Sequence, residues 1–214
     1  PAGRQARQGR TDFGDMTAKQ QTIATEATLK GVGLHTGESA TIRFLPGDEN
    51  TGVRFVRTDL PGKPSIDALA ANVTSTDRGT TLSAGDAGVL TVEHLLAAVG
   101  ALGLDNLIVE IDGPEVPIMD GSFQPFLASL QGAGTRELNA AANVLTVKEP
   151  ITATTERGES YTVVPSDTYR ISTTIQFDHP MIRRQFGSFD IGSTPSGGTI
   201  VQATLPVCRA VDQR

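Results

Sequence analysis

Two adjacent residues, Glu93 and His94, carry the side chains best suited to catalysis in this chain. They stand at the predicted start of an apolar helix, where the positive end of the helix dipole disfavours an imidazolium and keeps the imidazole neutral for metal binding. A carboxylate beside that imidazole can serve as a general base. Because a catalytic zinc ion takes three protein ligands and a water, the pair predicts one part of such a site.

The helix that carries this pair is predicted over residues 92–102, with Thr91 as its N-cap. Its apolar residues recur at the spacing of one helical face: Val92, Leu95, Leu96, Val99 and Leu102. At about 100° per residue, Glu93 and His94 point away from that face. They are therefore free to face another part of the protein. An arbitrary Glu-His pair is more often a surface carboxylate beside a half-exposed histidine, and that interpretation stays open at this point.

Two other polar residues are candidates, each with a plainer alternative. His35 lies in the glycine-rich loop 31–37 and either bonds its local backbone or supports a site. Asp120 precedes Gly121 and either caps the following helix, the common use of Asp-Gly, or orients a substrate or a histidine. For His179, which precedes a proline, we expect a structural role. The spacing of the three histidines matches no local zinc signature.

The composition is that of an ordinary globular protein, with 214 residues, 38% hydrophobic and 20% charged. The net charge of -6 argues against broad binding to nucleic acid or to an anionic membrane, both of which need clustered cations. The single cysteine, Cys208, excludes an internal disulfide framework and is typical of a reducing cytosol. No apolar run is long enough for a transmembrane segment.

Strand-like alternation and two helical patterns together predict an α+β fold. The strand-like segments are 21–31, 39–44, 53–58, 80–83 and 106–111. A second helix is predicted from Ser122 to Leu130, and the glycine-rich residues 131–134 mark its end. Residues 1–16 lack the apolar region of a secretory signal, and we expect them to form a disordered leader.

The second half of the chain repeats features of the first at intervals of about 120 residues. Gly-Glu-Ser at 37–39 and again at 158–160 precedes a predicted strand, and a proline and an aspartate follow in the same order. Two copies of one duplicated unit and a chance coincidence both remain open. In a duplicated unit, the counterpart of the helix that carries Glu93 would begin near residue 213.

Five segments, taken together, carry a resemblance to a known family: GVGLHTG (31–37), RGTTL (78–82), TVEHLLAAVGALGLDN (91–106), PEVPIMDGS (114–122) and FDHP (177–180). They resemble the UDP-3-O-acyl-N-acetylglucosamine deacetylases, the zinc amidases of lipid A biosynthesis in Gram-negative bacteria. The resemblance runs from about Lys19 to about Asp190. The joint occurrence of GLHTG, TVEHL and PIMDGS in this order makes it specific.

The resemblance implies a fold and a reaction. The fold is two similar two-layer α/β sandwich domains, each a sheet packed on helices, with the active site between them. The substrate is UDP-3-O-(3-hydroxyacyl)-N-acetylglucosamine, which loses its acetyl group as acetate in the cytoplasm. No nucleic acid is implied as a partner. Some relatives carry a fused fatty-acid dehydratase domain, which the full gene of this chain can also contain.

The resemblance also assigns roles to residues. His94 inherits the role of a Zn²⁺ ligand, and Glu93 that of the base that deprotonates the zinc-bound water. The residues expected to support the site or to lie near the substrate are His35, Asp120, Leu34 and Arg78.

The chain departs from the family pattern in its C-terminal part. The family's other two zinc ligands lie in an HKxxD motif that is absent here, as are a later histidine and the ART-F segment after Asp190. We therefore expect a first α+β domain at 17–138, a partial second domain at 139–190, and an aberrant or disordered tail at 191–214 caused by a frameshift or truncation. Such a chain would be an incomplete, weakly active or inactive deacetylase. The alternative is a non-catalytic binding or interaction module derived from the first domain.

Overall fold

The computed structural model describes residues 19–143, 145–193 and 199–204, with side chains described up to Asp190. The chain divides into two compact units, of which one is Met16–Asn143 and the other includes Val144–Arg214. Each is described by itself. The predicted disordered leader, residues 1–16, lies outside the described residues.

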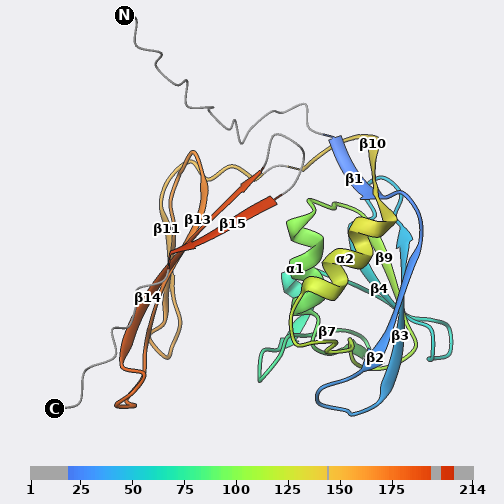
Figure 1. The fold of residues 1–214 in the computed structure, drawn as a ribbon, viewed down its shortest axis with the longest axis horizontal. Helices are drawn as coiled ribbons and strands as arrows, with labels where there is room; N and C mark the ends of the chain where they lie inside the picture. The colour runs from blue at the N-terminus through green and yellow to red at the C-terminus, as the bar shows by residue number, and fades with distance from the viewer. Residues whose placement is uncertain (1–18, 144, 194–198, 205–214) are drawn as a thin grey trace, which may run out of the picture. The chain divides into compact units, whose positions relative to one another are not determined.

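The first unit mixes short strands with two helices, which confirms the predicted α+β class (Figure 1). Its elements are β1 (Lys19–Ile23), β2 (Ala27–Val32), β3 (Ser39–Pro46), β4 (Val53–Arg57), β5 (Ser65–Asp67), the 3-10 helix η1 (Ala70–Asn72), β6 (Val73–Ser75), β7 (Thr81–Ala84), β8 (Ala87–Val89), α1 (Glu93–Ala101), β9 (Leu107–Ile111), α2 (Gln124–Ala133) and β10 (Thr135–Ala141). In the part of the chain that the structure describes, no helix has both the length and the apolar content needed to cross a membrane.

A five-stranded sheet forms one layer of this unit, in the order β2-β3-β9-β4-β5. Neighbouring strands are antiparallel except β4 and β9, which are parallel. Two smaller sheets complete the unit, one of β6, β7 and β8 and one of β1 and β10. The strand β10 follows α2 directly and returns to pair with the first strand of the unit.

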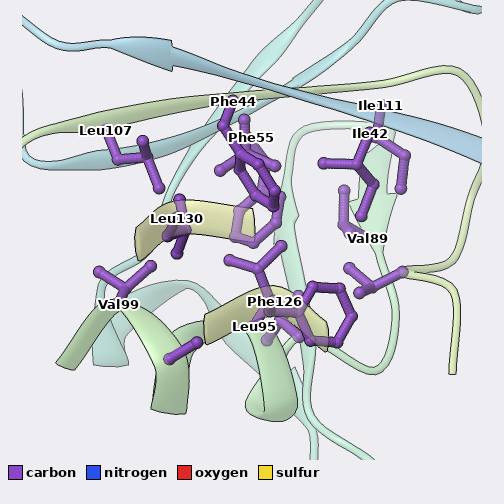
Figure 2. Close-up of a cluster of buried hydrophobic side chains, with 14 of the residues drawn as sticks. Ile42, Phe44, Phe55, Val89, Leu95, Val99, Leu107, Ile111, Phe126 and Leu130 are labelled. Atoms are coloured by element: carbon purple, nitrogen blue, oxygen red, sulfur yellow. The ribbon is translucent and has the colours of Figure 1, made fainter. Parts of the chain in front are cut away.

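The helices supply the second layer, and the core lies between the two layers. Side chains on one face of the sheet point towards apolar residues of α1 and α2, as Figure 2 shows. The fully buried members of this cluster include Ile42, Phe44, Phe55, Leu107, Val109 and Ile111 from the sheet and Leu95, Phe126 and Leu130 from the helices. The strand residues alternate in and out of the core, because successive side chains of a strand point to opposite faces.

The predicted strand at 21–31 is wrong in one respect, because the chain forms two strands there, β1 and β2. Between them, the backbone N–H groups of Ala24 and Thr25 donate to the carbonyls of Gly134 and Ala133 at 2.9 and 3.1 Å. The end of α2 thus draws these residues away from a continuous ladder. This contact is long-range and leaves no periodic signal in the sequence.

The predicted starts of both helices also differ from the structure. Thr91 is not the N-cap of α1, since Val92 occupies that position and makes no side-chain hydrogen bond there. Thr91 has a φ of 59°, and its hydroxyl donates instead to Glu115 at 2.9 Å. The second helix begins at Gln124 rather than Ser122.

The second unit is described as strands only. They are β11 (Ile151–Thr154), β12 (Ser160–Val163), β13 (Tyr169–Gln176), β14 (Arg184–Ser193) and β15 (Thr199–Thr204). The first two form a hairpin, and the other three form an antiparallel sheet. Within the segment 191–214, where we expect an aberrant or disordered tail, β14 continues to Ser193 and β15 pairs with it. Residues 194–198 and 205–214 lie outside the described residues.

Candidate active site

Glu93 is the first residue of α1, and a preceding loop holds its carboxylate in place. The backbone N–H of Thr80 donates to Oε2 of Glu93 at 2.9 Å. The carbonyl of the same Thr80 accepts the N–H of Val92 at 3.2 Å. One loop residue therefore binds both the carboxylate and the backbone in front of the helix, so the half-buried Glu93 side chain has a defined direction.

A glycine lies where three polar side chains converge. A β-carbon on Gly79 would lie 3.6 Å from each of Glu93 Oε1, His35 Nε2 and Thr91 Oγ1. The carbonyl of the neighbouring Arg78 accepts a hydrogen bond of 3.1 Å from Nε2 of His35, which fixes the orientation of the ring. The structure thus brings His35 and the second oxygen of Glu93 to the same side of Gly79, although the two residues lie far apart in the sequence.

His94 follows Glu93 on α1 and is half-buried. Within the described residues its ring has no hydrogen-bond partner, so its nitrogens are available to a ligand. Among those residues, no three or more of His, Cys, Asp and Glu are grouped so that they could hold a metal ion. A catalytic zinc site takes three protein ligands. The imidazole of His94 is a suitable zinc ligand, but the described residues do not supply the other two.

His179 lies in the second unit, in the turn between β13 and β14. Its carbonyl accepts the backbone N–H groups of Ile182 and Arg183 at 3.1 and 3.0 Å. Its Nδ1 accepts the N–H of Met181 at 3.2 Å. These contacts give His179 a structural role in its turn, as we expected for a histidine before a proline.

A buried carboxylate, Glu115, joins the two parts of this site. Its side chain is 1% exposed. It accepts the backbone N–H of His35 at 3.0 and 3.1 Å, that of Thr36 at 2.8 Å, and the hydroxyl of Thr91 at 2.9 Å. The loop that presents His35 and the turn that precedes Glu93 are therefore bound to the same group.

These donors keep Glu115 ionised. Burial raises the pKa of its carboxyl, but the backbone N–H groups of Thr36 and His35 and the side chains of Thr36 and Thr91 outweigh that effect, so the pKa lies below its ordinary value. Hydrogen bonds from neutral donors favour the charged form of a carboxylate. The group is thus a charged anchor beneath the site.

The other predicted residues lie around the loop and turn that Glu115 binds. Leu34 is 59% exposed and lies in a loop that the N–H of Gly33 closes by donating to the carbonyl of Glu38 at 2.9 Å. Arg78 is exposed and has a φ of 56°, and its backbone carbonyl reaches His35 as described above. The structure thus brings the backbone of Arg78 next to the ring of His35.

Asp120 makes its hydrogen bonds locally. Its Oδ1 accepts the N–H and the hydroxyl of Ser122 at 2.9 and 2.8 Å, and these bonds hold the pKa of the Asp120 carboxyl below its ordinary value. It organises the turn before α2. No hydrogen bond among the described residues links it to Glu93 or His94.

Sequence reasoning missed four residues that build this site: Glu115, Thr91, Thr80 and Gly79. The sequence pattern predicts a cap role for Thr91 and shows Glu115 only as part of the PEVPIMDGS motif. A single sequence carries no signal for a buried glutamate, because glutamates are rarely buried. The role of Thr80 comes from its backbone, which its residue type does not reveal.

Comparison with known proteins gives a family match over most of the chain. A family model described as "UDP-3-O-acyl N-acetylglycosamine deacetylase" (LpxC) matches residues 20–204. The match continues beyond Asp190, where we expected the resemblance to end. It includes all the residues of the candidate site.

Individual relatives agree with the family model. The chain is 46% identical over 171 residues to the UDP-3-O-acyl-N-acetylglucosamine deacetylase of Citrifermentans bemidjiense, an alignment that covers 80% of this chain and 56% of that protein. It is 44% identical over 173 residues to the protein of the same name from Myxococcus xanthus, with 81% and 55% covered. It is 40% identical over 173 residues to a "Bifunctional enzyme LpxC/FabZ" of Bacteroides thetaiotaomicron, with 80% and 38% covered.

The chain therefore spans just over half the length of the first two of these relatives. The matched segment holds the loop of His35, the turn of Thr91 and the helix start of Glu93 and His94. From this match we conclude that the chain belongs to the UDP-3-O-acyl-N-acetylglucosamine deacetylase family.

Proposed function

We propose that this chain supplies the general base and one zinc ligand of a deacetylase. The enzyme removes the N-acetyl group of UDP-3-O-(3-hydroxyacyl)-N-acetylglucosamine and releases acetate, the committed step of lipid A biosynthesis, in the cytoplasm. Family membership supports the substrate. The observation that carries the proposal is the fixed carboxylate of Glu93, bound at one oxygen by Thr80 and directed with the other towards Gly79 and His35.

Glu93 acts as the base in this proposal. Its Oε1 takes a proton from the water that attacks the acetyl carbonyl, while Oε2 stays bound to the amide of Thr80. A base held in one direction needs no reorganisation when the water approaches, and general base catalysis contributes about 100- to 10,000-fold in rate. His35 lies on the same side of Gly79 and serves to orient polar groups of the substrate.

His94 is assigned as a zinc ligand because its ring is available and because the family is a metalloenzyme family. The described residues supply one of the three ligands that a catalytic zinc needs, so they do not form a complete site and no step is assigned to the metal here. This shortfall also favours a second candidate for the isolated 214-residue chain. That candidate is a module that binds the UDP-sugar without hydrolysing it.

The remaining predicted residues have supporting roles in the proposal. Leu34, exposed on the loop beside His35, lines the entrance for the substrate, and Arg78 offers it a cation. Asp120 shapes the turn before α2. Because the Bacteroides relative is bifunctional by name, a fused dehydratase domain is part of the proposal for the full gene.

We further propose that the two units derive from one duplicated unit. The strands β3 and β12 begin at Ser39 and Ser160, the serines of the two Gly-Glu-Ser repeats. Each of these strands is the second of an antiparallel hairpin, with β2 and β11 respectively. The shared order of turn, strand and proline supports the duplication.

A chimera tests the function. Residues 20–204 of this chain replace the matched segment of the Citrifermentans bemidjiense relative, and acetate release from the UDP-sugar is measured. We expect release by the chimera, a loss of about 100- to 10,000-fold in Glu93→Gln, and no loss in Glu26→Gln, the same change at an exposed ion-paired residue. A folded chimera that contains zinc but releases no acetate would contradict the proposal.

The 214-residue chain is measured alongside the chimera. We expect it to contain less than one zinc per molecule and to release little acetate. Saturable binding of the UDP-sugar without release would favour the binding module for this chain. Stoichiometric zinc and full turnover would show that our account of its ligands is wrong.

A further inference from the structure

Glu115 has a feature that its burial alone does not explain. The carboxylate is 1% exposed, yet its partners are backbone N–H groups and hydroxyls, and among the described residues no cation forms an ion pair with it. Burying a charge without a counter-ion is costly. An apolar residue would fill the same space but would leave the N–H groups of His35 and Thr36 and the hydroxyl of Thr91 without this acceptor. The carboxylate therefore does more than fill the core.

The role of the Glu115 carboxylate follows from the backbone conformation of the residues that donate hydrogen bonds to it. Thr91, which donates its hydroxyl to Glu115 at 2.9 Å, is 3% exposed and has a φ of 59°. For a β-branched residue this region of φ is a genuine outlier. Such conformations persist only where the surrounding structure enforces them, and they cluster at active sites. The bond to Glu115 is one of the contacts that enforce it.

The strained residue lies directly in front of the functional pair. Glu93 is two residues after Thr91, and α1 has no side-chain cap that could define its start independently. An isolated bridge between Leu90 and Glu115 places the backbone before Thr91 against the backbone of Glu115. The direction in which α1 leaves this turn, and with it the positions of Glu93 and His94, depends on the conformation of Thr91.

The same carboxylate also sets the position of His35. It accepts the backbone N–H groups of His35 and Thr36, and Gly33 leaves no room for a side chain against it, because a β-carbon there would collide with Oε2 of Glu115. One buried charge is therefore bound to the loop of His35 and to the turn of Thr91. These are the two segments that converge on Gly79.

We propose that Glu115 is a positioning residue that fixes the His35 loop and the start of α1 as one unit. This inference rests on the proposed function in taking Glu93, His94 and His35 as residues of the site. Glu115 itself touches no reacting atom in this account. It acts through Thr91 and through the backbone of the loop.

Hydrogen exchange at the amide of Thr80 distinguishes a positioning role of Glu115 from a purely stabilising one. This amide donates to Glu93, and among the described residues it is not one of the hydrogen-bond donors of Glu115. In the 214-residue chain without metal or substrate, Glu115→Gln should speed hydrogen exchange at the amides of His35 and Thr36 by about tenfold or more, the effect of losing a hydrogen bond to a charged acceptor. If Glu115 positions the site, Glu115→Gln should also speed hydrogen exchange at the amide of Thr80 and shift the NMR signals of the His35 and His94 rings.

Substitutions of Thr91 test the same inference if Glu115→Gln fails to fold. Thr91→Val keeps the shape but removes the hydroxyl, and it should reproduce the changes at Thr80 and at both rings. Thr91→Ser keeps the hydroxyl and should restore the wild-type signals. The matched control is Asp112→Asn, which alters a carboxylate that also accepts a backbone N–H, that of Thr41 at 2.5 Å. It should leave the signals of the site unchanged.

Two outcomes would overturn the inference. The first is that Glu115→Gln or Thr91→Val changes the exchange of His35 and Thr36 alone, with Thr80 and both rings as in the wild type. The second is that Asp112→Asn produces the same shifts. The exchange and NMR measurements do not depend on catalysis. They can therefore contradict the positioning role while the chimera still releases acetate. Equally, the chimera can be inactive while these measurements support the positioning role.

Discussion

The backbone nitrogen of Thr80 lies 2.9 Å from Oε2 of Glu93 and donates a hydrogen bond to it. This single contact leaves the other oxygen of Glu93 directed towards Gly79, where His35 and Thr91 also converge. A carboxylate on the first turn of a helix is usually free to rotate in solvent. Here it is fixed at one oxygen, which gives the proposed general base a defined direction.

Gly79→Ala should impair the reaction without unfolding the protein. The added methyl group would lie 3.6 Å from Glu93 Oε1, His35 Nε2 and Thr91 Oγ1, an ordinary contact distance, but it would fill the space on which these polar atoms converge. We expect acetate release by the chimera to fall by at least about tenfold, the effect of about 1.4 kcal/mol on the barrier. The midpoint of urea unfolding should stay near that of the wild type.

The control for this prediction is Gly100→Ala. Gly100 lies in α1, and a β-carbon there would meet open space. We expect unchanged acetate release and a gain of about 0.5–1 kcal/mol in the free energy of unfolding, because alanine is favoured over glycine inside a helix. Equal activity of the two alanine variants would show that the space at Gly79 is not used.

Glu115 should make the stability of the chain depend on pH. Because its pKa is lowered in the folded state, its stabilising effect is fully present above the ordinary glutamate value of about 4.3 and is lost as the pH falls through the folded-state pKa. At neutral pH, Glu115→Gln should reduce the free energy of unfolding by about 1.5–3 kcal/mol, the range for hydrogen bonds to charged groups. Urea unfolding of both proteins across the acid range measures this difference.

The difference should be constant from neutral pH down to the ordinary glutamate value and should shrink below it. Glu26→Gln, at an exposed residue paired with Arg43, should change the free energy of unfolding by no more than about 1 kcal/mol. A difference between wild type and Glu115→Gln that grows on acidification would contradict the lowered pKa.

Asp120 should prove to be a turn residue whose acceptor oxygen matters more than its charge. Asp120→Ala removes the acceptor of the N–H and hydroxyl of Ser122 and should lower the free energy of unfolding, because both donors lose their partner in the turn. Asp120→Asn keeps an acceptor oxygen and should cost less. Urea unfolding ranks the three proteins. Acetate release by the chimera then shows whether the carboxylate has a second role, since a large loss in Asp120→Asn alone would indicate one.

Phe126 and Leu34 should separate stability from substrate binding. Phe126 is fully buried between the layers (Figure 2), and Phe126→Ala should reduce the free energy of unfolding by about 3–5 kcal/mol. Leu34 is 59% exposed, and Leu34→Ala should change it by less than about 0.5 kcal/mol. If Leu34 lines the entrance, the same change raises the KM of the chimera. An unchanged KM would remove Leu34 from the site.

The sequence alone predicted the α+β class, the position of α1 and the family. These features depend on local periodicity, such as the alternation of apolar residues in β3 and β9 and the helical spacing of Leu95 and Val99. They depend also on short motifs that stay together along the chain. Both are properties of neighbouring residues, so one sequence is enough to show them.

The sequence did not predict how the site is assembled. The hydrogen bonds that His35 and Thr91 donate to Glu115 join residues that are 80 and 24 positions apart. The hydrogen bond that Thr80 donates to Glu93 comes from a backbone group. It also gave Thr91 a cap role that the structure replaces with a strained turn. The sequence therefore determined which functional groups the site contains, because it places a glutamate and a histidine side by side. Only the tertiary structure decided the direction of that pair, because it buries a charged residue where both segments of the site can bind it.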